Sequence, residues 1–159
     1  MTTGVLVVGL GQRDRGDDAA GPAVAARVGA LGLPGVRVIE QEDPAGLLDA
    51  WAGAELVVVA DAVRSGRPPG TVHVLHAAHG PLPAWVGVGG THAFGLAEAV
   101  ELARALDRLP PELVIVGIEA GQFGLGEPVS PPVAGALDTA ATTVATIARA
   151  AGPRHPSAG

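Results

Sequence analysis

The sequence predicts an α/β protein, a single three-layer α/β/α sandwich around a twisted, mostly parallel sheet of roughly five strands. Short apolar runs alternate along the chain with longer segments of helical character, an alternation that favours parallel strands joined by helical crossovers. Two of the runs, Val5–Leu10 and Leu56–Ala60, are apolar throughout, as expected for central strands covered on both faces.

Each further element follows from its local sequence. Ala19–Val28 has helical character, with Pro22 near the first turn, where its missing N–H costs little. Val36–Gln41 is the second predicted strand, and Ala45–Trp51 is a short helix. The proline and glycine content of residues 65–70 predicts a turn.

The second half of the chain continues the alternation. The predicted elements are an edge strand at Thr71–Leu75, a loop over 76–90, a helix at His92–Leu106 with Thr91 as its N-cap, a strand at Leu113–Ile118, a glycine-rich loop over 119–128, and a last helix that begins at Ser130 and Pro131 and reaches Ala150. We expect residues 1–150 to form the domain and residues 151–159 to be a disordered tail.

Composition excludes several classes of function. The chain of 159 residues has no Cys, a net charge of −6, and Arg as its only strongly basic residue. Thiol nucleophiles and lysine Schiff bases are therefore excluded. No cluster of Arg forms a basic stripe, so nucleic-acid binding is not expected. No apolar run approaches the roughly 20 residues that span a bilayer, and no signal peptide is recognised, so we expect a cytoplasmic protein without membrane association.

Three side chains able to bind a metal stand at the ends of predicted elements. Asp18 lies in the loop after the first strand, Asp61 ends a buried strand, and His92 opens a helix. In an open parallel sheet, strand carboxyl ends and helix amino ends gather at one edge, so the three can meet. Two carboxylates and one imidazole suit Ni, Zn, Mn or Fe.

Each of these residues also has a structural explanation. Asp17 and Asp18 precede a helix, where one carboxylate can act as an N-cap. Asp61 can bond the backbone of the following loop or pair with Arg64. A single His such as His92 is more often structural, although a helix amino terminus would keep it neutral and able to bind metal.

Other motifs are weaker. Gly9-Leu10-Gly11 starts like a dinucleotide fingerprint, but Asp14 stands where the third glycine belongs, so a nucleotide-binding regulator remains a minor alternative. His73, His76 and His79 recur at steps of three, which places His73 and His76 on opposite faces of a strand. No Ser lies in a G-x-S-x-G motif, so a serine triad is poorly supported.

Four motifs in order resemble the hydrogenase maturation endopeptidases. They are GLGQ followed by GDDAAGP, then VVVADAV, then GTHAFGL, and finally LVIVGIEAGQFGLGEPVSPPV. The resemblance covers roughly residues 5–150. The chain departs from the family at Gln12, where Asn is usual, and in the loop Asp43–Gly46, where many members have a Gly-Thr or Gly-Ser step.

The resemblance implies an endopeptidase that removes a C-terminal extension from the large-subunit precursor of [NiFe] hydrogenase after nickel insertion. It implies that Asp18, Asp61 and His92 recognise nickel carried by the substrate, with weak intrinsic affinity, and that the protein is a monomer. The metal can then polarise the scissile carbonyl or activate water. The alternative is a non-catalytic, nickel-dependent checkpoint protein of the same fold.

Overall fold

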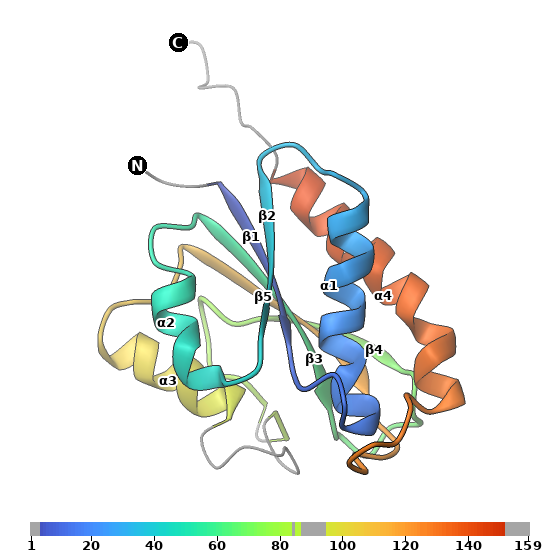
Figure 1. The fold of residues 1–159 in the computed structure, drawn as a ribbon. Coiled ribbons are helices and arrows are strands. Elements are labelled where there is room, and N and C mark those ends of the chain that lie inside the picture. Colours follow the sequence, from blue (N-terminus) through green and yellow to red (C-terminus); the bar gives the residue numbers. More distant parts are fainter. Residues whose placement is uncertain (1–3, 84, 87–94, 152–159) are drawn as a thin grey trace.

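The computed structural model describes residues 4–83, 85–86 and 95–151, and these contain a five-stranded sheet in the order β2-β1-β3-β5-β4 (Figure 1). The strands are β1 (Val5–Leu10), β2 (Val36–Gln41), β3 (Leu56–Val63), β4 (Val72–His76) and β5 (Glu112–Glu119). Neighbouring strands are parallel except that β4 pairs antiparallel with β5. The predicted mostly parallel sheet, with its fourth strand at an edge, is therefore confirmed.

Helices cover both faces of this sheet and complete the predicted three-layer sandwich. The helical elements are η1 (Gly16–Ala19), α1 (Ala20–Ala30), η2 (Pro44–Gly46), α2 (Leu47–Ala50), α3 (Leu96–Ala105) and α4 (Pro131–Ala150). Figure 1 shows α1 and α4 on one face and α2 and α3 on the other. None of the described helices has the length and apolar character that crossing a membrane requires.

The central strands are apolar throughout because they contribute to two cores. In β3, Val58 and Ala60 pack in the cluster that contains side chains of α1 and α4, whereas Val57 and Val59 pack in the cluster that contains Trp51. Successive strand residues point to opposite faces, so a strand buried on both sides needs an unbroken apolar run.

Two glycines let α1 lie directly on the sheet. A Cβ on Gly21 would lie 2.2 Å from the carbonyl oxygen of Leu10 and 2.5 Å from that of Ala60, and a Cβ on Gly9 would lie 2.5 Å from the carbonyl oxygen of Gly21. No larger residue fits at such distances. This close approach places η1, immediately before α1, at the carboxyl ends of β1 and β3.

The predicted helix at His92–Leu106 begins later than expected. In the structure α3 starts at Leu96, after Gly95, whose extended backbone makes it the N-cap. The side chain of Glu98 accepts a hydrogen bond from the Gly95 N–H at 3.1 Å. Gly95, and not the predicted Thr91, is therefore the N-cap of α3, and His92 lies outside the described residues.

Strand β3 is longer than predicted. It continues through Asp61 and Ala62 to Val63, because the end of β5 pairs with it as far as Glu119. Asp61 consequently lies inside the last part of the strand and not at its end. The extended backbone of this part holds the carboxylate at a fixed place on the sheet.

Candidate functional site

Asp18 lies in η1, at the carboxyl edge of the sheet, and its side chain is 5% exposed. Its Oδ2 accepts a hydrogen bond from the backbone N–H of Gln12 at 2.8 Å. Gly11 makes this turn possible, because its φ is +139° and a Cβ would lie 2.1 Å from the Asp18 carbonyl oxygen. The first loop thus wraps tightly around Asp18. Gln12, at which the chain departs from the family pattern, contributes its backbone to this contact.

Asp61 lies on β3 opposite Gly117 of β5. Removal from water raises the pKa of the Asp61 carboxyl well above its usual range, and the negative charge of Asp18 raises it further. A hydrogen bond from the backbone N–H of Ala62 opposes these effects only in part. A carboxylate in this environment is costly to ionise unless a cation lies nearby.

The structure therefore brings together two of the three side chains that the sequence singled out. Asp18 and Asp61 are 43 positions apart in sequence, yet the charge of one acts on the other. The third, His92, lies outside the described residues. Within the described part of the chain, no group of three or more His, Cys, Asp or Glu side chains is arranged to hold a metal ion.

Asp17, the chain neighbour of Asp18, has a structural role. It is fully buried, and its Oδ2 accepts hydrogen bonds from the N–H groups of Gly121 and Gln122 and from the Ser130 hydroxyl, while Oδ1 accepts one from the Ser130 N–H. Burial alone would raise the pKa of Asp17, but these hydrogen bonds hold it below its usual value. Asp17 thereby ties η1 to the loop before α4.

The structural explanations considered for Asp17, Asp18 and Asp61 are only partly correct. Neither Asp17 nor Asp18 makes a side-chain cap of η1 or α1. Asp17 instead bonds Ser130, the N-cap residue of α4. Asp61 does bond the following backbone, at Ala62, but Arg64 lies over the ring of Phe123, 4.4 Å from its centroid. Of the two alternatives for Asp61, the described residues form the backbone bond and not the ion pair with Arg64.

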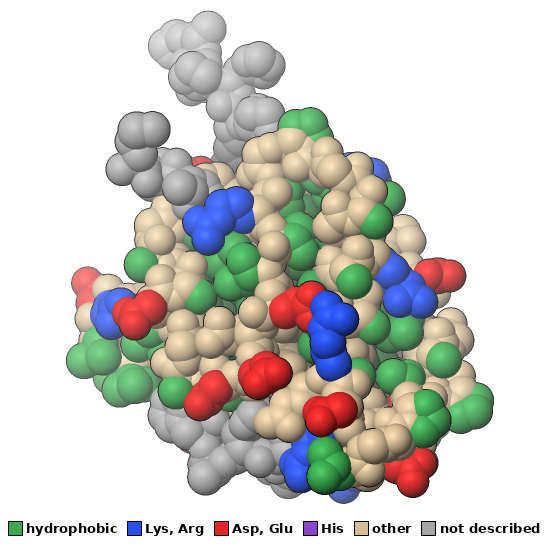
Figure 2. All heavy atoms as spheres, viewed as in Figure 1, with side chains coloured by type: hydrophobic (Ala, Val, Ile, Leu, Met, Phe, Trp, Pro, Cys, Tyr) green, Lys and Arg blue, Asp and Glu red, His purple; other side chains and the backbone are tan. Residues whose placement is uncertain are grey.

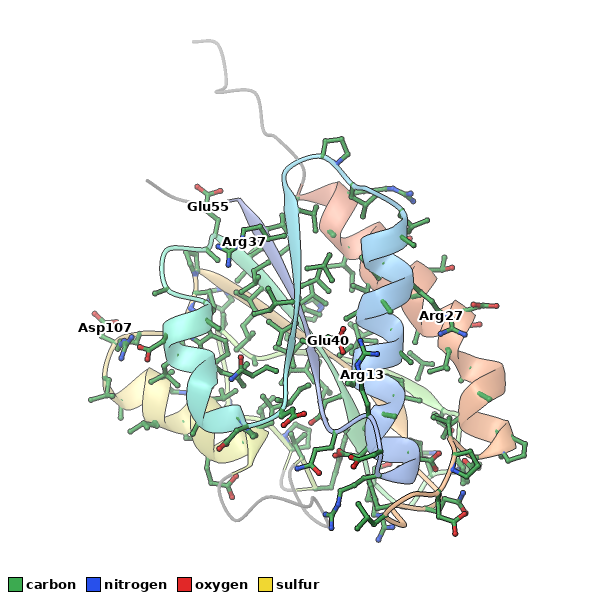
Figure 3. All side chains as sticks on the ribbon, viewed as in Figure 1. Arg13, Arg27, Arg37, Glu40, Glu55 and Asp107 are labelled. Carbon is green, nitrogen blue, oxygen red and sulfur yellow. The ribbon has the colours of Figure 1, made fainter. Side chains whose placement is uncertain are left out.

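An ion pair occupies the end of β2, where a dinucleotide-binding fold has its acidic ribose contact. Arg13, in the loop after β1, forms an ion pair with Glu40 near the end of β2, with its Nε donating to Oε1 at 2.7 Å. Figure 3 shows these two side chains pointing toward one another. Glu40 is therefore engaged and is a poor candidate for a ribose contact. On the face seen in Figure 2, basic side chains are scattered among acidic ones and form no stripe.

A second polar cluster, which the sequence analysis did not identify, lies at the ends of β3, β4 and β5. Glu119 is 2% exposed and bonds both Ser65 and His73. The sequence does carry a signal for this cluster. Glu119 is an acidic residue directly after a predicted apolar strand, as Asp61 is. His73 and His76 occupy alternate sides of β4 as predicted, with His73 half-buried and His76 exposed.

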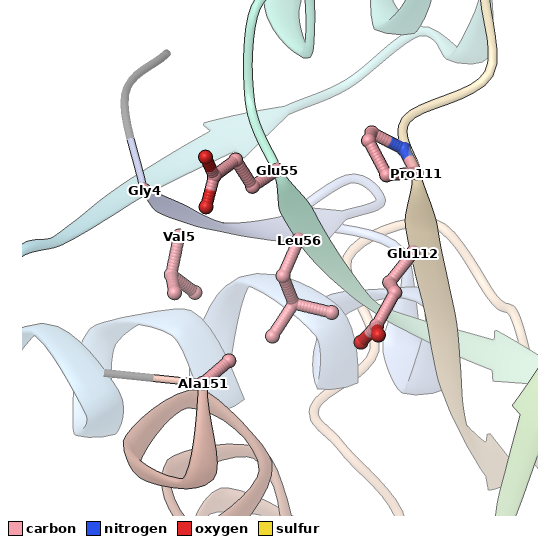
Figure 4. A pocket seen from close by; sticks show the side chains of 7 residues that line it. All are labelled: Gly4, Val5, Glu55, Leu56, Pro111, Glu112 and Ala151. Carbon is pink, nitrogen blue, oxygen red and sulfur yellow. The ribbon is translucent and has the colours of Figure 1, made fainter. Parts of the chain in front are cut away.

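A cavity of about 300 Å³ lies at the opposite edge of the sheet. It is lined by Gly4, Val5, Glu55, Leu56, Pro111, Glu112 and Ala151, at the amino ends of β1, β3 and β5 (Figure 4). In parallel sheets, ligands bind beyond the carboxyl ends of the strands. This cavity is therefore separate from the edge where Asp18 and Asp61 meet.

Comparisons with known proteins identify a family and agree with the fold. A family model described as hydrogenase maturation protease, HycI, matches residues 36–147. Comparison with curated protein sequences gives no significant match.

Solved structures of similar fold cover almost the whole chain. A solution structure of an endopeptidase from Escherichia coli is 26% identical, with a TM-score of 0.80 over 96% of this chain and 94% of that one. The hydrogenase maturating endopeptidase HybD from E. coli is 23% identical, with a TM-score of 0.72 over the same shares. The [NiFe] hydrogenase maturation protease HycI from Thermococcus kodakarensis is 26% identical, with a TM-score of 0.69 over 92% and 93%.

Proposed function

The chain belongs to the hydrogenase maturation protease family, and on that premise we propose that it removes a C-terminal extension from the large-subunit precursor of a [NiFe] hydrogenase and recognises the nickel that this precursor carries. The HycI structure from T. kodakarensis is named as a [NiFe] hydrogenase maturation protease, and we propose a hydrogenase of the same class as the client here. The cytoplasmic location and the monomeric state remain predictions.

One observation carries the nickel part of this proposal. Asp18 and Asp61 come from different elements, and the charge of Asp18 raises the pKa of the Asp61 carboxyl. Two carboxylates held this way repel each other until a cation lies between them. Carboxylate oxygens together with the imidazole proposed at His92 form a ligand set that suits a divalent first-row metal.

Substrate-borne nickel accounts for selectivity. A precursor without nickel brings no cation to offset the charges of Asp18 and Asp61, so the cost of holding two ionised carboxylates close together remains. A nickel-loaded precursor relieves that cost and places its scissile bond beside the metal. The metal supplies electrostatic polarisation of the carbonyl, and the carboxylates fix where the metal lies.

The test is intact-mass analysis of the precursor after incubation with the protein, with nickel-loaded and nickel-free precursor in parallel. We expect loss of a C-terminal peptide in the nickel-loaded sample only. Cleavage of both samples would contradict nickel recognition. Retention of the nickel-loaded precursor in a pull-down without any cleavage would instead favour the non-catalytic checkpoint protein.

A further inference from the structure

The proposed nickel site does not identify the general base of peptide hydrolysis. Hydrolysis requires a group that accepts a proton from the attacking water. In the proposed function Asp18 and Asp61 both bind nickel, so both are already assigned a role. The cluster of Ser65, His73 and Glu119, which this proposal does not use, lies at the same edge of the sheet.

Glu119 is the centre of that cluster. Its Oε1 accepts hydrogen bonds from the Ser65 hydroxyl and from His73 Nε2, the latter at 3.0 Å, and its Oε2 accepts one from the Ser65 N–H at 2.8 Å. Burial alone would raise the pKa of Glu119, but these bonds hold it below its usual value. Glu119 is thus a buried carboxylate, kept ionised by its two neighbours.

The ionised carboxylate fixes the direction of both hydrogen bonds. A carboxylate only accepts hydrogen bonds, so His73 Nε2 and Ser65 Oγ must both donate to it. In its neutral form, the His73 imidazole therefore carries its hydrogen on Nε2 and its lone pair on Nδ1. Ser65 gives its hydrogen to Glu119 and not to the imidazole, so the cluster lacks the order of a serine triad, in which the imidazole lies between serine and carboxylate.

His73 is held firmly yet remains accessible. Its ring packs against Trp85, with 5.0 Å between ring centroids and 48° between planes. Its side chain is 16% exposed. Among the described residues, Nδ1 has no hydrogen-bond partner. The lone pair of a fixed imidazole is therefore available to a substrate or to water.

The sheet register aligns His73 with Asp61. Both residues pair with Gly117, Asp61 from β3 and His73 from β4, so the three lie in one row and on one face. With strands about 4.8 Å apart, the Cα atoms of Asp61 and His73 are about 10 Å apart. Gly117 has no side chain, and the two γ-methyl groups of Val63, 3.0 and 3.1 Å from where a Gly117 Cβ would be, pack into the space above it.

We propose that His73 is the general base of the peptide hydrolysis, with Glu119 as the residue that positions its imidazole. This inference rests on the proposed function. An O–H bond of water breaks, its proton moves to His73 Nδ1, and the oxygen bonds to the scissile carbonyl carbon. The C–N bond then breaks, and His73 returns the same proton to the leaving amine nitrogen. Glu119 stabilises the imidazolium that exists between the two transfers.

The decisive variant is His73→Gln, because a glutamine amide can still donate to Glu119 but has no basic nitrogen. Under single turnover with nickel-loaded precursor, we expect the cleavage rate to fall about 10²- to 10⁴-fold, as for loss of a general base, while precursor binding is unchanged. His76→Gln, on the exposed side of the same strand, is the matched control and keeps the wild-type rate. If His73→Gln does not fold, as judged by thermal unfolding, His73→Asn takes its place.

Two further variants separate the roles within the cluster. Glu119→Gln is expected to lower kcat with little change in KM, because it disturbs the imidazole and not the docking of the precursor. Ser65→Ala is expected to slow cleavage by about 10- to 100-fold without abolishing it, since a lost hydrogen bond to a charged group costs about 1.5–3 kcal/mol and about 1.4 kcal/mol corresponds to tenfold in rate. A folded Ser65→Ala variant without cleavage would overturn the inference in favour of a serine nucleophile.

The proposed function and this inference fail in different ways. Wild-type protein that does not cleave nickel-loaded precursor contradicts the proposed function. Wild-type protein that cleaves, together with a folded His73→Gln variant that cleaves at the same rate, overturns the role of His73 alone.

Discussion

Asp17 and Asp18 are adjacent in the chain, yet their carboxylates serve different parts of the molecule. Asp17 is fully buried and accepts four hydrogen bonds from the segment 121–130. Asp18 accepts a hydrogen bond from the Gln12 backbone, and its charge raises the pKa of Asp61. One carboxylate therefore holds the loop before α4 in place, and the other faces the proposed metal site.

Replacing Asp17 with Asn is expected to destabilise the fold. The amide places an NH₂ group where a carboxylate oxygen accepts hydrogen bonds, so at least one buried donor loses its acceptor. Each such loss costs about 1–3 kcal/mol, so we expect the free energy of unfolding to fall by about 2–4 kcal/mol. Urea denaturation measures the change. Asp14→Asn, an exposed position in the same loop, is the control and should lie within about 0.5 kcal/mol of wild type.

The contribution of Asp17 should depend on pH in one direction. Because its folded-state pKa lies below its usual value, the unfolded chain binds more protons in acid, and stability is lost as pH falls. The difference between wild type and Asp17→Asn should be complete at pH 7. The pKa of Asp in the unfolded chain is about 3.9. As pH falls below this value and approaches the lower pKa of Asp17 in the folded protein, the stability difference should shrink. A difference that stays constant through this range would contradict the prediction.

Asp61→Asn is expected to stabilise the protein while abolishing cleavage. The pKa of Asp61 is higher in the folded protein than in the unfolded chain. As pH rises through the range between these two values, ionisation of Asp61 increasingly destabilises the folded protein. The amide removes that cost, and we expect a higher Tm than wild type at pH 7, with the gain disappearing near pH 4.

The activity of the same variant should fall at least about a hundredfold, because metal polarisation contributes several kcal/mol and about 1.4 kcal/mol corresponds to tenfold in rate. Differential scanning calorimetry and precursor cleavage provide the two measurements. An Asp61→Asn variant that is less stable at neutral pH would show that the carboxylate is already neutralised within the protein.

Gly21→Ala tests how closely α1 lies on the sheet. The new Cβ would meet the carbonyl oxygens of Leu10 and Ala60 at 2.2 and 2.5 Å, so α1 must move outward and carry Asp18 with it. We expect a loss of about 1–3 kcal/mol of stability from overpacking and a marked loss of cleavage. Gly135→Ala is the matched control, because no atom lies within 4 Å of its Cβ position. It should gain about 0.5–1 kcal/mol from helix propensity.

His92→Ala tests the third proposed nickel ligand. We expect loss of precursor trimming with an unchanged circular dichroism spectrum and unchanged thermal unfolding. His76→Ala, an exposed histidine outside the site, should trim normally. Trimming at the wild-type rate by His92→Ala would show that nickel recognition does not involve this residue.

Local sequence determined most of the fold. The apolar runs Val5–Leu10 and Leu56–Ala60 could only be strands buried on both faces, and Pro131 after Ser130 marked the start of α4. The prediction failed where it depended on one helix boundary. The hydroxyl of Thr91 favours an N-cap there, because it can accept a backbone hydrogen bond, whereas in the structure Gly95 and Glu98 form the start of α3.

The sequence by itself also selected Asp18 and Asp61, because acidic residues at the carboxyl edge of a parallel sheet are exposed to ligands. Only the tertiary structure decided which of Asp17 and Asp18 is buried by the loop before α4. Only the pairing of β3 and β4 with β5 revealed that Asp61 and His73 flank Gly117 in one row of the sheet. Such relations depend on strand register and on contacts between residues more than 40 positions apart, and neither leaves a periodic pattern in the local sequence.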